Sequence, residues 1–135
     1  MKTHAFRLHQ GQDIKKAIKQ YMKDNNIQAG VVLTVVGCVD KAVLRMAGAT
    51  PEKFDIRTYV DKLEIVSLIG TVSKTDSHLH ISLSNKEGQV IGGHLKGEAI
   101  VDVTAEVVLG ELEDIQFSTE EDPNTGYKEL KIIKK

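Results

Sequence analysis

The sequence is poor in the residues that give small domains disulfide bonds or aromatic binding surfaces. It has no tryptophan, and its 135 residues include one cysteine, two prolines, three tyrosines and three phenylalanines. Cys38, the single cysteine, excludes an internal disulfide, and its place in the apolar run VVLTVVGCV predicts a buried, unreactive thiol. So few aromatic residues argue against a platform that stacks the bases of single-stranded nucleic acid.

Membrane and secretory signals are also missing. No run of about 18 apolar residues occurs, and no basic segment followed by an apolar one opens the sequence. We therefore expect a cytoplasmic protein with no membrane association. The phosphate-binding loop, the dinucleotide fingerprint, the paired-cysteine motif and the serine-hydrolase elbow are likewise absent. The common nucleotide-binding and hydrolase classes are therefore not indicated.

The charge is nearly balanced but unevenly distributed. The formal net charge is −1, with 27% charged and 41% hydrophobic residues, and we expect residues 1–135 to form one globular domain. Residues 98–122 contain many acidic side chains but no lysine or arginine. Because DNA binding needs a basic stripe that displaces counterions from phosphate, this segment argues against DNA wrapping on that side. The lysines gather elsewhere, at Lys15, Lys16, Lys19, Lys23, Lys128, Lys131, Lys134 and Lys135.

One segment has the spacing of an amphipathic helix. We predict this helix over residues 13–24, with Asp13 as the N-cap and Asn25-Asn26 as the end. Lysines cover the opposite, outer face of the helix. The apolar residues recur at intervals of three and four, which places them on one face, and they are Ile14, Ala17, Ile18, Tyr21 and Met22.

The first half of the remaining chain has the pattern of long strands. A weakly alternating edge strand is predicted at residues 4–8. The β-branched run at 29–39 predicts a buried strand, which a tight turn at Asp40-Lys41 would join to residues 42–46 as a hairpin. After a break around a proline, a third long strand is predicted at residues 59–72.

The second half also predicts strands. Gly97 is expected to end one strand, and Glu98 is expected to begin the next, whose apolar residues, Val103 among them, alternate on one face as far as residue 107. The last predicted elements are a strand at 111–117, a turn at 122–126 and a strand at 127–133. The fold class is therefore α+β, with a largely antiparallel sheet of about seven to eight strands and one main helix.

Three of the five histidines lie within residues 77–95. His78 and His80 are two residues apart in an alternating run, so on a strand both side chains leave the same face, ~7 Å apart along it. The segment Asn85-Lys86-Glu87-Gly88 suits a three-residue hairpin loop that ends in a left-handed glycine. That loop would place His80 opposite His94, whereas a two-residue loop would pair His94 with Ile81 and turn it to the other face.

Three imidazole nitrogens with a fourth position left open are typical of a catalytic zinc site rather than of a closed structural one. Two histidines that alternate on a strand more often form a solvated face than a ligand pair. A third histidine at a compatible register, together with the Gly92-Gly93 pair that permits close approach of backbone or ligand, favours the metal site.

Glu64 is a further candidate because apolar residues flank it in the strand at 59–72. A buried carboxylate is costly unless it is paired, hydrogen-bonded or bound to a metal. If Glu64 is buried near the histidines, it would serve as a fourth ligand or as a general base. If the strand exposes it, it is an ordinary surface residue, and the sequence leaves both interpretations open.

The segments KLEIVSLIGTVS and HLHISLSNKEGQVIGGHLKGEAIV resemble the core of the PPC (plants and prokaryotes conserved) domain, and the similarity extends over nearly the whole chain. The resemblance implies a homotrimer and, as in stand-alone prokaryotic members, a metal, usually taken as zinc, held by His78, His80 and His94. Plant relatives carry AT-hook segments and act as nuclear DNA-binding regulators. No Arg-Gly-Arg-Pro core occurs here, and the chain is expected to start directly at the domain, which argues against DNA binding.

The domain also resembles acetolactate decarboxylase distantly in fold, which supplies a second functional hypothesis. The first hypothesis is a trimeric zinc-binding module that binds a small ligand, DNA or a regulatory partner protein. The second is a zinc-dependent enzyme that acts on a small carbonyl or carboxylate substrate, with Glu64 as general acid and base. In that enzyme Arg45 or Arg57 would hold the substrate carboxylate, and Gly92 and Gly93 would line the ligand pocket.

Overall fold

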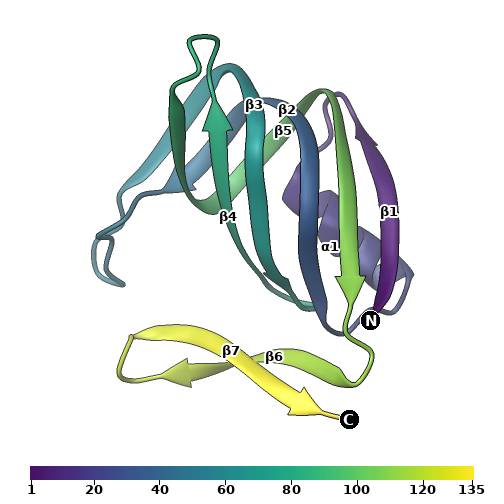
Figure 1. Ribbon diagram of the computed structural model, residues 1–135. Coiled ribbons are helices and arrows are strands. Elements are labelled where there is room, and N and C mark those ends of the chain that lie inside the picture. Colours follow the sequence, from purple (N-terminus) through teal and green to yellow (C-terminus); the bar gives the residue numbers. More distant parts are fainter.

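The computed structural model describes residues 1–135, which form seven strands and one helix (Figure 1). Five strands make one antiparallel sheet in the order β1-β5-β2-β3-β4, and the last two make a separate hairpin. The fold class predicted from the sequence is therefore confirmed. The elements are β1 (Lys2–His9), α1 (Ile14–Asp24), β2 (Gly30–Arg45), β3 (Ile56–Val72), β4 (Ser77–Ser84), β5 (Val90–Glu111), β6 (Ile115–Asp122) and β7 (Tyr127–Lys134).

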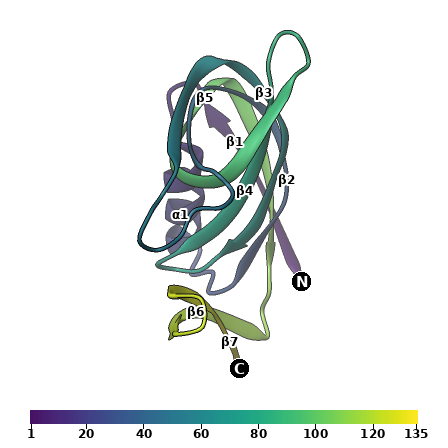
Figure 2. The ribbon, with the colours of Figure 1, turned by 90° about the vertical axis from the view of Figure 1, so that its left-hand side faces the viewer.

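The main sheet closes on itself because β4 pairs with both β3 and β5. β5 is long enough to pair with three strands: its first residues pair with β4, and its later residues pair with β2 and β1. Figure 2 shows the strong curvature that this closure requires. Only β1 is left at an open edge, as its sequence pattern predicts.

The helix is confirmed, with the cap and the buried face that its sequence predicts. The Asp13 side chain accepts hydrogen bonds from the backbone N–H groups of Lys15 and Lys16, and a cap of this kind stabilises a helix by ~1 kcal/mol. Ile14, Ile18 and Met22 are fully buried against the sheet. The core therefore lies between α1 and one face of the curved sheet.

The predicted hairpin at Asp40-Lys41 is wrong, because β2 runs without interruption from Gly30 to Arg45. A shift in register between Val39 and Lys41 absorbs the irregularity in the pattern. A two-residue hairpin needs residues that accept positive φ angles, such as glycine or asparagine, and neither is present at this point. Instead, β2 is paired with β3 on one side and with β5 on the other, and both pairings continue beyond this point.

The predicted strand boundary at Gly97 is also wrong, because β5 is one strand from Val90 to Glu111. Gly97 lies where the chain packs closely on β2, since a Cβ atom there would be 3.0 Å from the Cβ of Val43. Glycine within a strand can therefore indicate a close approach rather than an end.

Val103 departs from the predicted alternation. Its φ is 63°, in the left-handed region, and it is 68% exposed. Gly37 lies opposite Ala105 while Cys38 lies opposite Asp102, so two residues of β5 have no partner on β2 at this point. This bulge turns Val103 outward and buries Asp102 instead.

The C-terminal hairpin lies apart from the main sheet, across its lower end in Figure 1. The strand predicted at residues 111–117 is shifted, because β5 continues to Glu111 and β6 begins at Ile115. The predicted turn is confirmed, with Gly126 at φ 77°, and so is the closing strand β7. Backbone hydrogen bonds from Leu112 and Phe117 to the segment before β2 tether the hairpin.

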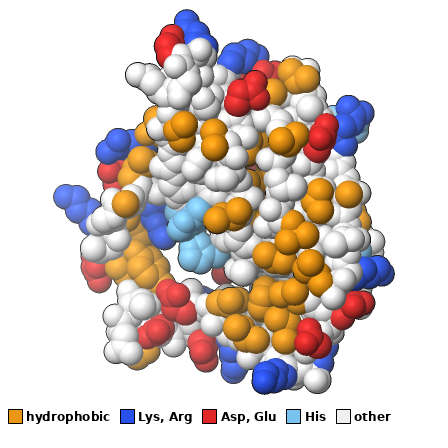
Figure 3. Space-filling view, in the orientation of Figure 1, with side chains coloured by type: hydrophobic (Ala, Val, Ile, Leu, Met, Phe, Trp, Pro, Cys, Tyr) orange, Lys and Arg blue, Asp and Glu red, His pale blue; other side chains and the backbone are white.

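The outer face of the sheet carries considerable apolar surface. Ile69 lies directly opposite His80 on the β3–β4 pair, so this surface borders the histidines. Figure 3 shows apolar side chains gathered beside the histidines on this face. No helix of the protein has the length and apolar character needed to span a membrane. The residues of this face that are more than half exposed include Val36, Val66, Ile69 and Val103.

A candidate metal centre

The hairpin between β4 and β5 has the three-residue loop that the sequence predicts. The N–H of Asn85 donates to the carbonyl of Gln89 at 3.0 Å, and Gly88 has a φ of 78°. The Asn85 side chain accepts hydrogen bonds from the N–H groups of Glu87 and Gln89, which holds the turn in place. His80 consequently lies opposite His94, and the predicted register is confirmed.

This register brings three imidazole rings together from two neighbouring strands. The ring centroids of His78 are 5.1 Å from those of His80 and of His94, and His80 and His94 are 5.7 Å apart. One ring nitrogen from each histidine lies within 4.8 Å of the other two. Ligand nitrogens around a tetrahedral zinc are ~3.4 Å apart at usual bond lengths, so modest ring rotations would bring the three into that geometry.

The electrostatics keep two of these rings neutral at pH 7. Partial burial, followed by the charge of Arg45, lowers the pKa of His94 to about 4. Partial burial, followed by His78 and Arg45, also lowers the pKa of His80. A neutral imidazole offers a lone pair, which a metal requires. The Nδ1 atom of His94 is buried with no hydrogen-bond partner within the chain, so the protein itself leaves this ring nitrogen unsatisfied.

The two glycines after the hairpin allow the strands to approach closely beside the histidines. A Cβ atom at Gly92 would lie 2.5 Å from the carbonyl oxygen of Ile81, and one at Gly93 would lie 2.8 Å from the carbonyl oxygen of Arg45. Both glycines line a hollow of about 400 Å³ that also borders His80 and His94. Both glycines therefore lie beside the histidines; that a ligand occupies this hollow stays a prediction.

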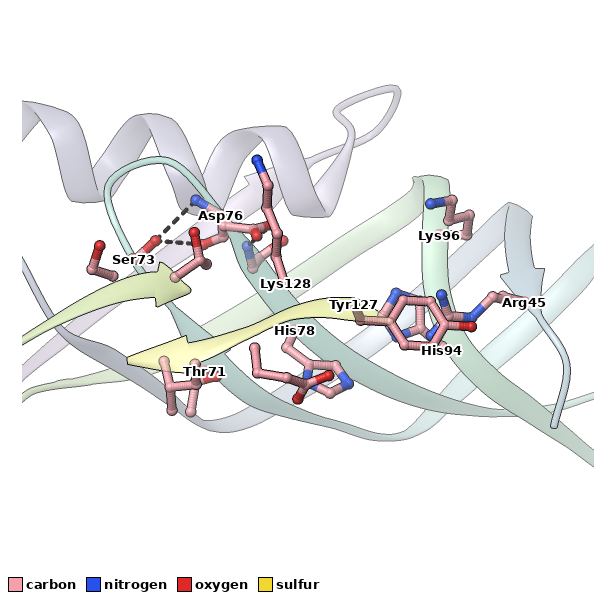
Figure 4. A pocket seen from close by; sticks show the side chains of 14 residues that line it. Arg45, Thr71, Ser73, Asp76, His78, His94, Lys96, Tyr127 and Lys128 are labelled. Atoms are coloured by element: carbon pink, nitrogen blue, oxygen red, sulfur yellow. Dashed lines mark hydrogen bonds between the residues drawn. The ribbon is translucent and has the colours of Figure 1, made fainter. Parts of the chain in front are cut away.

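Arg45 lines the same hollow as the two glycines and lies next to His94. Its backbone is directly opposite His94 on the β2–β5 pair, and its guanidinium lies 5.5 Å from the ring centre of Phe54 and 5.2 Å from that of Tyr127. It has no carboxylate within ion-pairing distance. In Figure 4 its side chain is close to His94 and Tyr127.

The structure does not bring Glu64 or Arg57 to the histidines. Glu64 is exposed and lies opposite Ser84 and Cys38, roughly 13 Å along β4 from His80 at the usual rise of a strand. Burial and the nearby Glu64 charge raise the pKa of the Cys38 thiol. Arg57 is exposed and paired with Asp55 through two hydrogen bonds of 3.2 and 3.0 Å.

A second cavity, of about 360 Å³, lies between the histidines and the C-terminal hairpin (Figure 4). It adds residues that the sequence analysis did not identify, among them Lys96 and Tyr127. Lys96 follows His94 by two residues, so strand periodicity could have indicated it. Tyr127 has no local signal, because its approach to Arg45 depends on how the hairpin folds back.

A family model of the Plants and Prokaryotes Conserved (PCC) domain matches residues 1–113. Among curated relatives, the bifunctional protein GlmU of Synechococcus sp. (strain JA-2-3B'a(2-13)) is 36% identical over 132 residues, which are 98% of this chain and 20% of that protein. The AT-hook motif nuclear-localized protein 2 of Arabidopsis thaliana is 28% identical over 115 residues, or 79% of this chain and 33% of its own length. The chain thus spans about a fifth of the length of the GlmU relative.

Solved structures with a similar fold cover most or nearly all of the chain. A hypothetical protein from Salmonella enterica is 30% identical, with a TM-score of 0.93 over 99% of this chain and 94% of its own. A metal-containing protein from Archaeoglobus fulgidus is 28% identical, with a TM-score of 0.83 over 95% and 91%. A protein from Staphylococcus aureus that is similar to alpha-acetolactate decarboxylase is 16% identical, with a TM-score of 0.56 over 84% and 54%. This last likeness concerns the fold alone.

Proposed function

The chain belongs to the Plants and Prokaryotes Conserved (PCC) domain family, and on that premise we propose that it is a cytoplasmic, homotrimeric module that binds zinc through His78, His80 and His94. The observation that carries the proposal is the convergence of three imidazole nitrogens within 4.8 Å of one another. Three protein ligands leave a fourth position for water or a ligand.

The donor set supports zinc over harder cations. The cluster consists of histidines alone, without a carboxylate, and imidazole suits zinc and other late transition metals, whereas magnesium and calcium prefer oxygen. The lowered pKa values of His80 and His94 keep their lone pairs available at neutral pH. The similar protein from Archaeoglobus fulgidus is described as metal-containing.

Trimer formation is supported by the exposed apolar face. Val36, Val66, Ile69 and Val103 are each more than half exposed on the sheet, and a soluble monomer rarely leaves a large continuous apolar patch uncovered. Sedimentation equilibrium should therefore give three times the chain mass of 14.9 kDa. A monomer at micromolar concentration would contradict this part of the proposal.

The test of the metal site is a comparison of two alanine variants. Purified wild-type protein, loaded with zinc and then dialysed, should retain one zinc per chain by elemental analysis. The His80→Ala variant should retain much less, because only two ligands remain. The matched control is His9→Ala, since His9 is exposed and only its backbone N–H, not its imidazole, makes a hydrogen bond. Equal zinc content in wild type and His80→Ala would refute the site.

An enzymatic role is the second candidate, and the open fourth position together with the unpaired Arg45 favours it. Zinc lowers the pKa of a bound water to about 7 and polarises carbonyl groups. The side chains that face the cluster would supply orientation, with Arg45 as the available cation for a substrate carboxylate. Glu64 is too distant for direct proton transfer at the cluster, so water or a pocket residue would have to perform that step.

DNA binding is the weaker candidate. The similar Arabidopsis thaliana protein carries an AT-hook motif by name, whereas this sequence has no Arg-Gly-Arg-Pro core. Any binding through the lysines of α1 would be non-specific and would weaken steeply as salt increases. An electrophoretic shift that depends on DNA sequence and persists at high salt would favour the DNA role over the one proposed here.

A further inference from the structure

Arg45 is a half-buried cation without a partner anion. Its guanidinium packs on the faces of Phe54 and Tyr127 at 5.5 and 5.2 Å, and no carboxylate of the chain lies within ion-pairing distance of it. Arg57, by contrast, is exposed and bonded to Asp55. Aromatic faces position a guanidinium but leave its fork of N–H donors free, so Arg45 can still accept a planar anion.

The 360 Å³ cavity that Arg45 lines has two chemically different ends. In Figure 4, Arg45, Lys96 and His94 lie at one end, whereas Ser73, Asp76 and Lys128 lie toward the other, where an acidic and a basic side chain are close together. The cationic end is the one beside the histidine cluster. Its positive charge would increase further when a metal binds, and this favours an anionic group there.

The remainder of the lining is rich in hydroxyl groups. Only Tyr127 and Leu130 contribute large apolar side chains to the cavity. Ser73 is already engaged, because its Oγ accepts from the N–H groups of Thr75 and Asp76. Four serine and threonine hydroxyls of the lining have no hydrogen-bond partner within the chain and can bond to a ligand; they belong to Thr71, Ser77, Ser118 and Thr119.

From these observations we propose that the cavity binds a small polyhydroxylated carboxylate. The carboxylate lies between Arg45 and the metal position, and the hydroxyl groups extend toward the free hydroxyls and toward Asp76 and Glu129. This inference rests on the proposed zinc site, since the metal supplies the second contact of the carboxylate. The volume is at the lower end of the range for small-molecule pockets, which suits a ligand of sugar-acid size.

Carboxylate fits the cationic end better than phosphate does. Phosphate sites usually add several backbone N–H groups, as at a helix N-terminus or a glycine-rich nest, and neither a residue of α1 nor a glycine lines this cavity. A single guanidinium matches the two oxygens of a carboxylate in a bidentate pair.

The wall opposite the histidines comes from the C-terminal hairpin. Ser118, Thr119 and Tyr127 belong to β6 and β7, whereas the family model ends at residue 113. The histidine cluster and Arg45 lie within the matched segment, and part of the hydroxyl lining lies outside it. The hairpin therefore determines which carboxylate fits, while the matched segment supplies the histidine ligands of the metal and the guanidinium of Arg45.

The experiment is calorimetric titration of the zinc-loaded full chain with D-gluconate, which has a carboxylate and five hydroxyls. Hexanoate lacks the hydroxyls, sorbitol lacks the carboxylate, and inorganic phosphate tests the other anion. Gluconate should bind at least about tenfold more tightly than each of these, because each probe loses a set of hydrogen bonds. Zinc content is measured again after each titration, so that extraction of the metal is not mistaken for binding.

Substitutions at Arg45 and Thr119, each with a matched control outside the cavity, locate the ligand. Arg45→Gln should weaken gluconate binding by about tenfold or more, and Arg45→Lys by less, because the charge remains while the fork is lost. Arg57→Gln is the matched control and should bind as wild type does. Thr119→Val should weaken binding by roughly threefold to tenfold, and Thr58→Val, an exposed strand position outside the cavity, should not.

The outcomes separate this inference from the zinc proposal. A protein that takes up no zinc would overturn both. A protein that holds one zinc per chain but binds no gluconate, or binds it equally well after Arg45→Gln, would overturn the inference alone. Equal affinity for hexanoate would contradict the proposed hydroxyl contacts. Tighter binding of phosphate would contradict the assignment of the ligand as a carboxylate. Zinc retention by Arg45→Gln shows that the variant is folded.

Discussion

The protein contains two side-chain clusters that use histidine in opposite ways. Near the N-terminus, both ring nitrogens of His4 are occupied: Nδ1 lies 3.0 Å from the hydroxyl of Tyr21, and Nε2 lies 2.7 Å from a carboxylate oxygen of Glu111. In the β4–β5 cluster, by contrast, Nδ1 of His94 is buried with no partner. A fully bonded histidine is structural, whereas a cluster of unbonded ring nitrogens beside a cation leaves room for a ligand.

The structural cluster joins three elements. His4 is on β1, Tyr21 is on α1 and Glu111 ends β5, so its hydrogen bonds connect the open edge of the sheet to the helix. The ring of Tyr21 also stacks on Phe6, with centroids 4.1 Å apart. The β4–β5 cluster joins only neighbouring strands that the sheet already holds together, and its three rings add little to the fold.

The largest expected difference between the clusters is in zinc affinity. His94→Ala removes one of the three proposed ligands and should weaken zinc binding by about 100-fold or more, because even outer-shell partners of a metal contribute 10- to 100-fold. His4→Ala should leave zinc affinity within about twofold of wild type. Competition with a chromogenic zinc chelator measures both. A His94→Ala variant with wild-type affinity would show that the two clusters do not differ in this way.

The same two substitutions should affect the free energy of unfolding in the opposite order, with the larger loss for His4→Ala. His4→Ala leaves the Tyr21 hydroxyl and the Glu111 carboxylate without their partner, and it should lower the free energy of unfolding by about 1–3 kcal/mol. In metal-free protein, His94→Ala should cost less than His4→Ala, since the imidazole it removes has an unpartnered nitrogen. Urea denaturation of both variants in a chelating buffer checks this order. A larger loss for His94→Ala would contradict the assigned roles.

The pH dependence of stability sharpens the same contrast. The pKa of His94 in the folded protein is lowered from 6.5 to about 4, so between these values the unfolded chain binds the proton more readily. Stability of the metal-free protein should therefore decrease as the pH falls from 6.5 toward 4, and it should be insensitive to this group above 6.5. Urea midpoints across this range measure the slope, and His94→Ala should make it shallower. An unchanged slope would argue against the neutral state of His94.

The smallest effect concerns the tyrosine beside each cluster. Tyr127→Leu removes one of the two aromatic faces that hold Arg45, and a contact of this kind contributes about 0.5–1 kcal/mol at partly exposed sites. Zinc affinity should change little, and gluconate affinity should decrease by about twofold to fivefold. Tyr21→Phe, the counterpart at His4, should lower stability by about 0.5–1.5 kcal/mol without affecting either ligand. A loss of zinc in Tyr127→Leu would mean that the hairpin supports the metal site itself.

Much of the candidate site could be predicted because it depends on local geometry. The period of a strand places His78 and His80 on one face, and the turn-forming residues from Asn85 to Gly88 determine the loop length. Loop length then determines the register, which brings His94 to the same side. The helix was predictable for a similar reason, since its cap and its apolar spacing lie within twelve consecutive residues.

Predictions failed where distant segments decide local structure. Asp40-Lys41 and Gly97 look like breaks in the sequence, but partner strands on both sides carry β2 and β5 through them. Val103 follows the alternation of its neighbours in sequence, yet a bulge against β2 turns it outward. For Glu64 the sequence left two interpretations open, and the structure places it on the exposed face of its strand.

By itself, the sequence determined the elements that depend on contacts within about twenty residues, including the capped helix and the histidine hairpin. The tertiary structure alone decided that Arg45 lies beside His94, that Arg57 and Glu64 lie elsewhere, and that Tyr127 packs on Arg45. The physical reason is range: turn geometry and side-chain periodicity act along the backbone, whereas the environment of a charged side chain depends on which remote segments the closed sheet and the C-terminal hairpin bring next to it.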